Sequence, residues 1–299
     1  MVDHRGKCSA NCSFCPQSRS TKGKDPQLSR ITWPRLPLPE VITKLGDAVE
    51  SHKLFRACIQ TLNYPTLLEE LLELVVYFQK IKNLPISIAV HPLPPEGFQR
   101  LKAAGVDRVG IALDGCTRSI FERIKGGDVQ GPYHWETTLA SLREALTMFG
   151  VGKVATHFIV GLGETEEELL RAVQDVKDLG VSPSLFAFTP IRGTQEESRV
   201  QPPILQYRKM QLGRELLVNR GKKLTSFTFS PTGVLQSFNL TSNEIRDIFQ
   251  NGSAFQTRGC PHCNRPYYDS RPGGTIYNYA ANLSNQHKAE IQKLLQPFV

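Results

Sequence analysis

Strand-like and helix-like segments alternate along most of this 299-residue chain, and this alternation limits its fold more than any other feature. Strands that alternate with helices pair in parallel, because each helix returns the chain to the same end of the sheet. With about seven or eight such units, the economical architecture is an α/β fold of the TIM-like (β/α) barrel type. Functional residues of such barrels sit where strands end and loops begin.

Hydrophobic periodicity and turn residues set the expected elements. Strands are expected at 55–60, 85–91, 108–114, 153–160, 184–189 and 224–230, and helices at 40–50, 66–81, 96–104, 118–125, 135–149, 165–179, 203–220 and 242–250. Two helices are expected to begin at a capping box, Thr66 with Glu69 and Thr165 with Glu168. We divide the chain into a barrel over residues 1–250 and a C-terminal extension over 251–299 at the barrel mouth.

The first loop holds three cysteines, Cys8, Cys12 and Cys15, in the spacing C-x3-C-x2-C. Three thiolates on one tight loop can ligate three irons of a cubic iron–sulfur cluster and leave the fourth iron open. Zinc is the alternative, but a structural zinc site needs four N or S ligands, and His4 is the nearby candidate for a fourth. An open metal position favours chemistry over scaffolding.

This spacing resembles the signature of the radical S-adenosylmethionine (SAM) enzymes. The resemblance implies a [4Fe–4S] cluster whose open iron chelates the amino and carboxylate groups of SAM. It also implies an electron donor, such as a ferredoxin or flavodoxin, and cleavage of SAM to a 5′-deoxyadenosyl radical. Phe14 matches an aromatic residue that lies near the adenine in this family, although taken alone Phe14 would be ordinary core. Seven residues precede Cys8, so we expect the first barrel strand to be truncated.

A second segment, His157–Glu164, ends an expected strand and opens a helix. It resembles the strand-5 pattern G-x-I-x-G-x-x-E of the family, with Ile159, Gly161 and Glu164 in place and His157 instead of the first glycine. The resemblance implies contact with the adenine through the backbone and Ile159. Without a ligand, the same glycines would read as a tight strand–helix turn.

Asp114 ends an earlier expected strand. It matches the aspartate that bonds the SAM ribose in the biotin-synthase branch of the family, although Ala112 stands where that branch has asparagine. Taken alone, Asp114 would read as a helix N-cap. The segment Phe188–Thr194 resembles the part of the same branch that lies near the methionyl end of SAM.

A C-terminal C-x2-C pair, Cys260 and Cys263, needs further ligands to hold a metal. The remaining cysteines, Cys58 and Cys116, both fall at expected strand ends. Four cysteines that converge on one mouth would hold a second cluster, either [4Fe–4S] or [2Fe–2S]. Zinc at the same four positions is the rival, and inert buried cysteines are the ordinary reading of Cys58 and Cys116.

Two arginines, Arg265 and Arg271, flank the C-terminal pair. An arginine fork could hold a substrate carboxylate or position a carrier protein, although both side chains could equally be plain surface. The surrounding G-C-P-x-C-N-R-P-Y-Y segment resembles biotin-synthase-like proteins of some prokaryotes that act as a two-component lipoyl synthase. In those, two related radical SAM proteins insert sulfur into a protein-bound octanoyl chain.

The resemblance therefore implies a radical SAM sulfurtransferase that acts on a small molecule or a carrier-bound acyl chain, with a second radical SAM protein as a possible partner. A radical SAM enzyme without sulfur insertion, such as a mutase or cofactor-assembly enzyme, stays open. So does a non-enzymatic iron–sulfur or zinc protein.

Composition narrows the setting of the chain. No apolar run is long enough to cross a bilayer, and the first residues lack the apolar region of a signal peptide. Seven cysteines without secretion signals favour reduced thiols in the cytoplasm. The net charge of +8 is spread along the chain, without a basic block interleaved with aromatics, so nucleic acid is a poor candidate for a partner.

Overall fold

The computed structural model describes residues 8–22, 35–263, 269–270 and 273–299. A five-stranded parallel sheet runs in sequential order through β1 (Ala57–Gln60), β2 (Ile86–Ala89), β3 (Arg108–Gly110), β4 (Val154–Val160) and β5 (Ser182–Ala187). Sequential parallel order is the winding of a (β/α) barrel, whereas a doubly wound sheet reverses its order midway. The prediction of a TIM-like α/β fold is confirmed.

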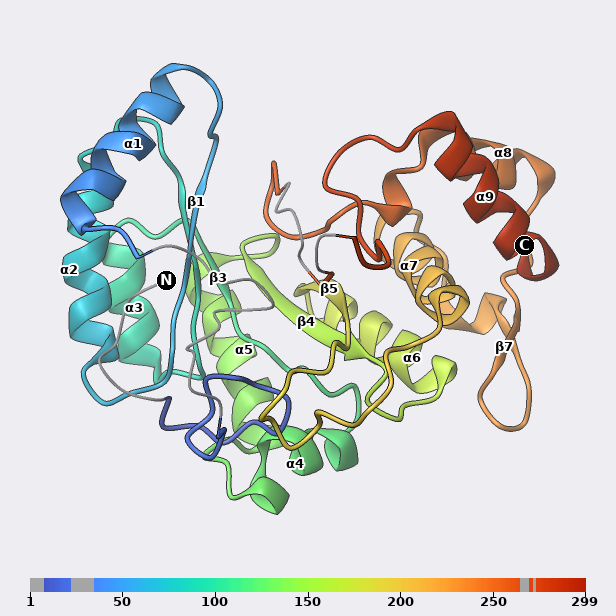
Figure 1. Ribbon diagram of the computed structural model, residues 1–299, viewed down its shortest axis with the longest axis horizontal. Coiled ribbons are helices and arrows are strands. Elements are labelled where there is room, and N and C mark those ends of the chain that lie inside the picture. Colours follow the sequence, from blue (N-terminus) through green and yellow to red (C-terminus); the bar gives the residue numbers. More distant parts are fainter. Residues whose placement is uncertain (1–7, 23–34, 264–268, 271–272) are drawn as a thin grey trace.

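Helices connect and cover these strands (Figure 1). They are α1 (Leu38–Glu50), α2 (Leu67–Gln79), α3 (Pro95–Ala103), α4 (Arg118–Lys125), α5 (Trp135–Phe149), α6 (Glu166–Asp178) and α7 (Ile204–Asn219). Two further helices, α8 (Ser242–Asn251) and α9 (Asn285–Leu295), lie on the far side of α7 from the sheet (Figure 1). The predicted truncation of the first strand concerns residues 1–7, which lie outside the described part of the chain. The predicted boundary at residue 250 falls in the last turn of α8 and stays a prediction.

The strand β4 illustrates how the sequence sets the two faces of the sheet. Successive side chains of a strand point to opposite faces. Phe158 and Val160 are fully buried, whereas His157 and Ile159, which alternate with them along the strand, line a cavity inside the barrel. The strand therefore places polar and apolar side chains in the cavity without breaking the core behind it.

One expected strand is not part of this sheet. Residues 224–230 were predicted to form a further barrel strand, but Leu224–Ser226 is a short 3-10 helix and β6 (Thr228–Phe229) pairs antiparallel with β7 (Leu235–Ser237). The turn between them contains Pro231 and Gly233, which has a φ of 76°. These residues favour a hairpin, so the prediction of seven or eight barrel units was too high for the described residues.

The two predicted capping boxes have different outcomes. Thr165 and Glu168 form the predicted box at the start of α6. At α2 the prediction was wrong, because the Thr66 hydroxyl donates to Glu70 at 2.6 Å, and Glu69 instead pairs with Arg100 of α3. The sequence therefore predicts where a helix starts, but it does not predict which of two neighbouring carboxylates bonds the hydroxyl at that start.

Helix α7 lies between the sheet layer and the C-terminal helices (Figure 1). It is buried almost all round, so its polar side chains need partners within the protein. The Arg208 guanidinium donates to the carbonyls of Ile276 and Tyr277, and Lys209 pairs with Glu166 of α6.

Within the described residues, no helix is long and apolar enough to cross a membrane.

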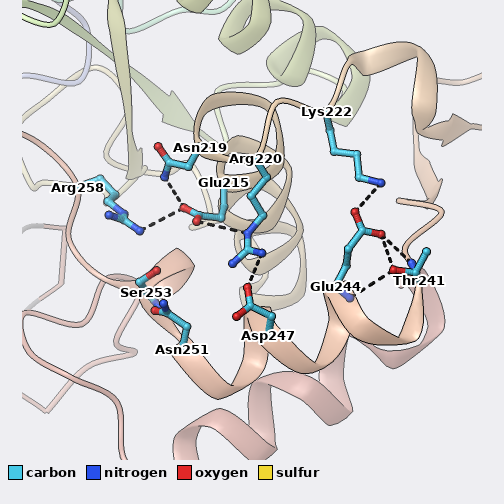
Figure 2. A network of polar contacts seen from close by, with 10 residues as sticks. All are labelled: Glu215, Asn219, Arg220, Lys222, Thr241, Glu244, Asp247, Asn251, Ser253 and Arg258. Carbon is cyan, nitrogen blue, oxygen red and sulfur yellow. Dashed lines mark hydrogen bonds and ion pairs between the residues drawn. The ribbon is translucent and has the colours of Figure 1, made fainter.

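Replacing Glu244 with glutamine is expected to destabilise the protein by about 0.5–1 kcal/mol. Glu244 lies 2.7 Å from the Lys222 ammonium and closes the capping box of α8 with Thr241 (Figure 2). The hydrogen bond from Lys222 and those from Thr241 lower the pKa of Glu244 from 4.5 to about 2. Its contribution is thus complete above pH 4.5 and is lost as the pH falls toward about 2.

Urea unfolding at several pH values tests this expectation. The stability gap between the wild type and the Glu244→Gln variant should narrow as the pH falls through that window. Glu290→Gln, which changes an exposed glutamate of α9, is the matched control and should show no such narrowing. A gap that stays constant with pH would contradict the assignment.

Candidate functional site

The three N-terminal cysteines lie on a loop at the carboxyl end of the parallel strands, in the dark blue segment at the bottom of Figure 1. The loop is fixed to Asn63, just beyond β1, whose carbonyl accepts from the Ser9 N–H at 2.7 Å. The Asn63 N–H in turn donates to the Cys8 sulfur at 3.2 Å. A turn in which the Cys15 N–H donates to the Cys12 carbonyl at 3.1 Å brings the last two cysteines together.

Two of these thiols lie in a poorly solvated setting. Burial raises the pKa of Cys15 to about 11 and raises the pKa of Cys12 further, although the nearby Lys125 ammonium opposes the rise at Cys12. A thiol in such a place is protonated and inert unless a cation is bound, because metal coordination deprotonates it. The raised pKa values therefore argue against a reactive nucleophile at Cys12 and Cys15, and a bound metal would be needed to ionise these two thiols.

A cavity of about 250 Å³ opens beside the loop. Its walls come from the cysteine loop, the ends of β1 and β5, and the inner face of β4. The lining residues are Phe14, Cys15, Pro16, Gln17, Gln60, Thr61, Leu62, Asp114, His157, Ile159, Phe186, Phe188, Thr189 and Ile191. The predicted residues Phe14, Asp114 and Ile159 thus meet on one cavity together with Cys15, and the predicted segment 188–194 contributes as well.

Asp114 is held by two basic side chains. Its Oδ2 lies 2.7 Å from the Lys125 ammonium, and its Oδ1 lies 2.9 Å from Nε2 of His157. Burial alone would raise the pKa of Asp114, but the charges and hydrogen bonds of Lys125 and His157 outweigh it and hold the pKa well below its usual range. Asp114 does not cap α4, whose N-cap is Thr117, so that reading is excluded.

Lys125 is a residue that the sequence did not single out. It is 5% exposed, donates to the Ala112 carbonyl at 2.8 Å as well as to Asp114, and lies over the ring of Tyr133. From the sequence, Lys125 would be an ordinary exposed lysine in the last turn of a helix, where its positive charge interacts favourably with the helix dipole. Only the tertiary fold turns it inward.

Gly161 and Glu164 build the turn after β4 and are not among the residues that line the cavity. The Glu164 carboxylate accepts from the N–H groups of Gly161 and Leu162 at 2.6 and 2.8 Å. Burial raises the pKa of Glu164, and these hydrogen bonds oppose the rise. Gly161 has a φ of 102°, and a Cβ there would lie 2.9 Å from Pro202, so a side chain is excluded.

The four remaining cysteines do not share one position in the fold. Cys58 is the second residue of β1, and the thiol of Cys260 lies 3.0 Å from the hydroxyl of Ser87 on the neighbouring strand. Cys116 is buried beyond the end of β3, where burial and the charges of Glu164 and Glu168 raise its pKa. Within the described residues no group of three or more His, Cys, Asp and Glu side chains is close enough together to hold a single metal ion.

Three residues that the sequence singled out lie outside the described part of the chain. They are His4, Arg265 and Arg271.

Glu215 of α7 anchors the segment that leads to Cys260 (Figure 2). Its buried carboxylate lies 3.1 Å from the guanidinium of Arg258 and 3.7 Å from that of Arg220, and it accepts from Asn219 at 2.5 Å. Arg258 stands two residues before Cys260. The ion pair between Glu215 and Arg258 thus fixes the segment just before Cys260 to α7.

Replacing Glu215 with glutamine is expected to cost about 3 kcal/mol, because Arg258 loses its buried counter-charge and Arg220 keeps only its pair with the more exposed Asp247 among the described residues. The urea midpoint should fall, and proteolysis should reach the segment around residue 260 sooner. Asp247→Asn, which breaks the more exposed pair with Arg220, is the matched control and should cost less than about 1 kcal/mol. Equal effects of the two variants would argue against an anchor at Glu215.

Comparison with known protein families gives the ancestry of this site. Residues 2–176 match the family model described as the radical SAM superfamily. The chain belongs to that superfamily. The match spans the cysteine loop, Asp114 and the turn after β4, so the predicted membership is confirmed.

Curated relatives of this radical SAM protein include biotin and lipoyl synthases. It is 31% identical over 205 residues to the biotin synthase of Persephonella marina, which covers 66% of this chain and 55% of that protein. It is 28% identical over 186 residues to the lipoyl synthase of Haemophilus influenzae, which covers 58% of this chain and 52% of that protein. The matches span about half the length of these relatives.

Solved structures agree in fold. The FeFe-hydrogenase maturase HydG from Carboxydothermus hydrogenoformans matches with a TM-score of 0.55 at 17% identity, over 71% of this chain and 49% of that one. Methylornithine synthase (PylB) matches with a TM-score of 0.53 at 15% identity, over 70% of this chain and 60% of that one. At such identities the likeness shows the shared fold and nothing of the substrate.

Proposed function

We propose that this chain is an enzyme that cleaves SAM reductively and inserts sulfur, taken from a second iron–sulfur cluster, into an unactivated C–H bond. The proposal of SAM cleavage rests on the cysteine loop, because Cys15 of this loop lines a cavity inside the barrel. The loop lies at the carboxyl end of the strands, where active sites of (β/α) barrels are built.

The residues present fit a [4Fe–4S] cluster with SAM beside it. Three thiols stand on one loop, a donor set that suits three irons of a cubane and leaves the fourth for another ligand. The cavity next to Cys15 is close to the lower end of the volumes of small-molecule pockets, about 300 Å³. When bound, the cluster would supply the electron that breaks a carbon–sulfur bond of SAM.

The chain's own side chains bind, orient and exclude water. Phe14 and Ile159 offer flat and branched apolar surface on the cavity wall, which suits an adenine ring. Leu62, Phe186 and Phe188 extend that apolar wall, and apolar walls help to keep solvent from a reactive radical. No acid or base is needed for such chemistry, so positioning and protection are the work of the protein.

Sulfur insertion is supported by two independent features. The curated relatives are named biotin synthase and lipoyl synthase. The chain also has cysteines beyond the first loop, and Cys260 meets Ser87 beside Cys58 in the sheet. We propose an acyl chain bound to a carrier protein as the substrate, a ferredoxin or flavodoxin as the electron donor, a second radical SAM protein as a partner, and the cytoplasm as the location.

The test is anaerobic reconstitution of the whole chain with iron and sulfide, followed by reduction with dithionite in the presence of SAM. Formation of 5′-deoxyadenosine, and its coupling to sulfur in an octanoyl-carrier substrate, is the expected result. Deoxyadenosine without sulfuration would reduce the proposal to a radical SAM enzyme of another reaction class. No deoxyadenosine at all would favour a non-enzymatic iron–sulfur protein and overturn the proposal.

A further inference from the structure

Cys58 and Ser87 stand side by side near the amino ends of their strands. They are register partners in the parallel pair of β1 and β2, so their side chains point to the same face of the sheet. Ala57 and Ile59 on either side of Cys58 are buried, whereas Cys58 itself is exposed. The thiol therefore faces away from the helices that cover the sheet.

The C-terminal pair is folded against the same place. The Cys263 N–H donates to the Cys260 carbonyl at 3.0 Å and closes a turn, and the Cys260 thiol lies 3.0 Å from the Ser87 hydroxyl. A Cβ on Gly259 would lie 3.2 Å from the sulfur of Cys263, so the glycine lets that thiol fold back over the turn. The ring of His262 lies 5.1 Å from that of Phe55, just before β1.

Cys116 belongs to the other end of the sheet. Ser87 pairs with Arg108, and Val109 pairs with Val154, which puts Ser87 on the level of residue 153 of β4. Asp114, two residues before Cys116, is bridged to Phe158, five residues farther along β4. At 3.3 Å per residue this separates the two levels by about 16 Å along the strands.

We propose that Ser87, and not Cys116, completes the second metal site. Three thiols, those of Cys58, Cys260 and Cys263, and the hydroxyl of Ser87 hold an iron–sulfur cluster at the amino ends of β1 and β2. The assignment rests on the proposed function for its choice of cluster over zinc. The ligand set itself comes from the strand register, the turn at Cys260 and the contact between Cys260 and Ser87.

Arg56 gives this site its outer hydrogen bond. Its Nη1 donates to the Ser87 oxygen at 3.0 Å and lies 2.7 Å from Asp107, which also pairs with Lys153. Donors of this kind orient a metal ligand and favour its ionised form. The guanidinium also offsets part of the negative charge that three thiolates bring. A substrate would then lie inside the barrel, between the two ends of the strands.

The test isolates the second site by removing the first. A chain with Cys8, Cys12 and Cys15 all replaced by alanine is reconstituted anaerobically with iron and sulfide, and iron, sulfide and zinc per chain are measured. We expect about four irons. Adding Cys260→Ala or Ser87→Ala should remove more than about half of that iron, whereas adding Cys116→Ala, the matched control, should leave it unchanged.

Ser87→Cys keeps the assignment testable if Ser87→Ala fails to fold, which circular dichroism and the thermal transition would reveal. This variant should retain the iron and change the Mössbauer signal of one iron, because a sulfur replaces an oxygen ligand. Loss of iron in the Cys116→Ala background, full iron without Ser87, or zinc in place of iron would each overturn the assignment.

Two results separate this inference from the proposed function. If the wild type forms deoxyadenosine but the triple variant binds no iron, SAM cleavage stands and the second site fails. If the triple variant keeps its iron but the wild type never cleaves SAM, the second site stands and the proposed function fails.

Discussion

Replacing Cys12 with alanine is expected to lower deoxyadenosine formation by more than about 100-fold, beyond what the loss of an outer-shell partner costs a metal site. Cys12 lies between the other two cysteines of the loop in the sequence, and burial raises the pKa of its thiol, so the sulfur stays protonated unless a metal binds it. Two thiolates cannot hold a cubane whose fourth iron is already open. Iron per reconstituted chain should fall together with the activity.

Cys116→Ala is the matched control for this experiment. Cys116 is also a buried cysteine, but it lies against Glu164 and Glu168 and away from the loop. Its replacement should leave deoxyadenosine formation within about twofold of the wild type, since it removes a sulfur without touching the cavity. Continued SAM cleavage by the Cys12→Ala variant would show that the loop is not the cluster site.

The sequence predicted those features that depend on near neighbours in the chain. The strand over residues 153–160, the capping box at Thr165 and the turn at Gly161 all follow from local periodicity and backbone chemistry, and the structure has each of them. The parallel sheet follows from the alternation of such elements. The meeting of Phe14, Asp114 and Ile159 on one cavity follows in turn, because parallel strands end at one edge.

Features that depend on the choice among distant partners were not predictable. Leu224–Phe229 has the composition of a buried strand, yet its last two residues pair with β7 instead of with the barrel sheet. The turn at Pro231 places β7 next to these residues in the chain, whereas any strand of the sheet is far away in sequence. Cys58 and Cys116 look alike in the sequence, both in apolar surroundings near strands. Their positions differ because Cys58 lies near the start of one strand and Cys116 lies past the end of another. These positions depend on the register between neighbouring strands, which a single sequence does not reveal.

Replacing Lys125 with methionine is expected to destabilise the protein by about 3–5 kcal/mol near neutral pH, the cost of breaking a buried ion pair. Methionine fills a similar volume, but among the described residues the Asp114 carboxylate keeps only His157 as an ion-pair or hydrogen-bond partner. The double variant with Asp114→Asn should recover at least about 2 kcal/mol, because both buried charges are then gone. Lys44→Met, at an exposed lysine of α1, is the control and should cost less than about 0.5 kcal/mol.

The pH dependence of the two proteins should run in opposite directions. In the wild type the pKa of Asp114 lies below the ordinary 3.8, so its contribution is complete above that value and is lost as the pH falls below it. Without Lys125, we expect burial to raise the pKa of Asp114, so the variant should gain stability as the pH falls and the carboxyl takes up a proton. The gap in unfolding free energy should therefore be widest near neutral pH and should narrow toward pH 4, as measured by urea titration. A gap that widens toward low pH, or a cost below about 1 kcal/mol at neutral pH, would mean that Lys125 does not support the Asp114 wall of the cavity.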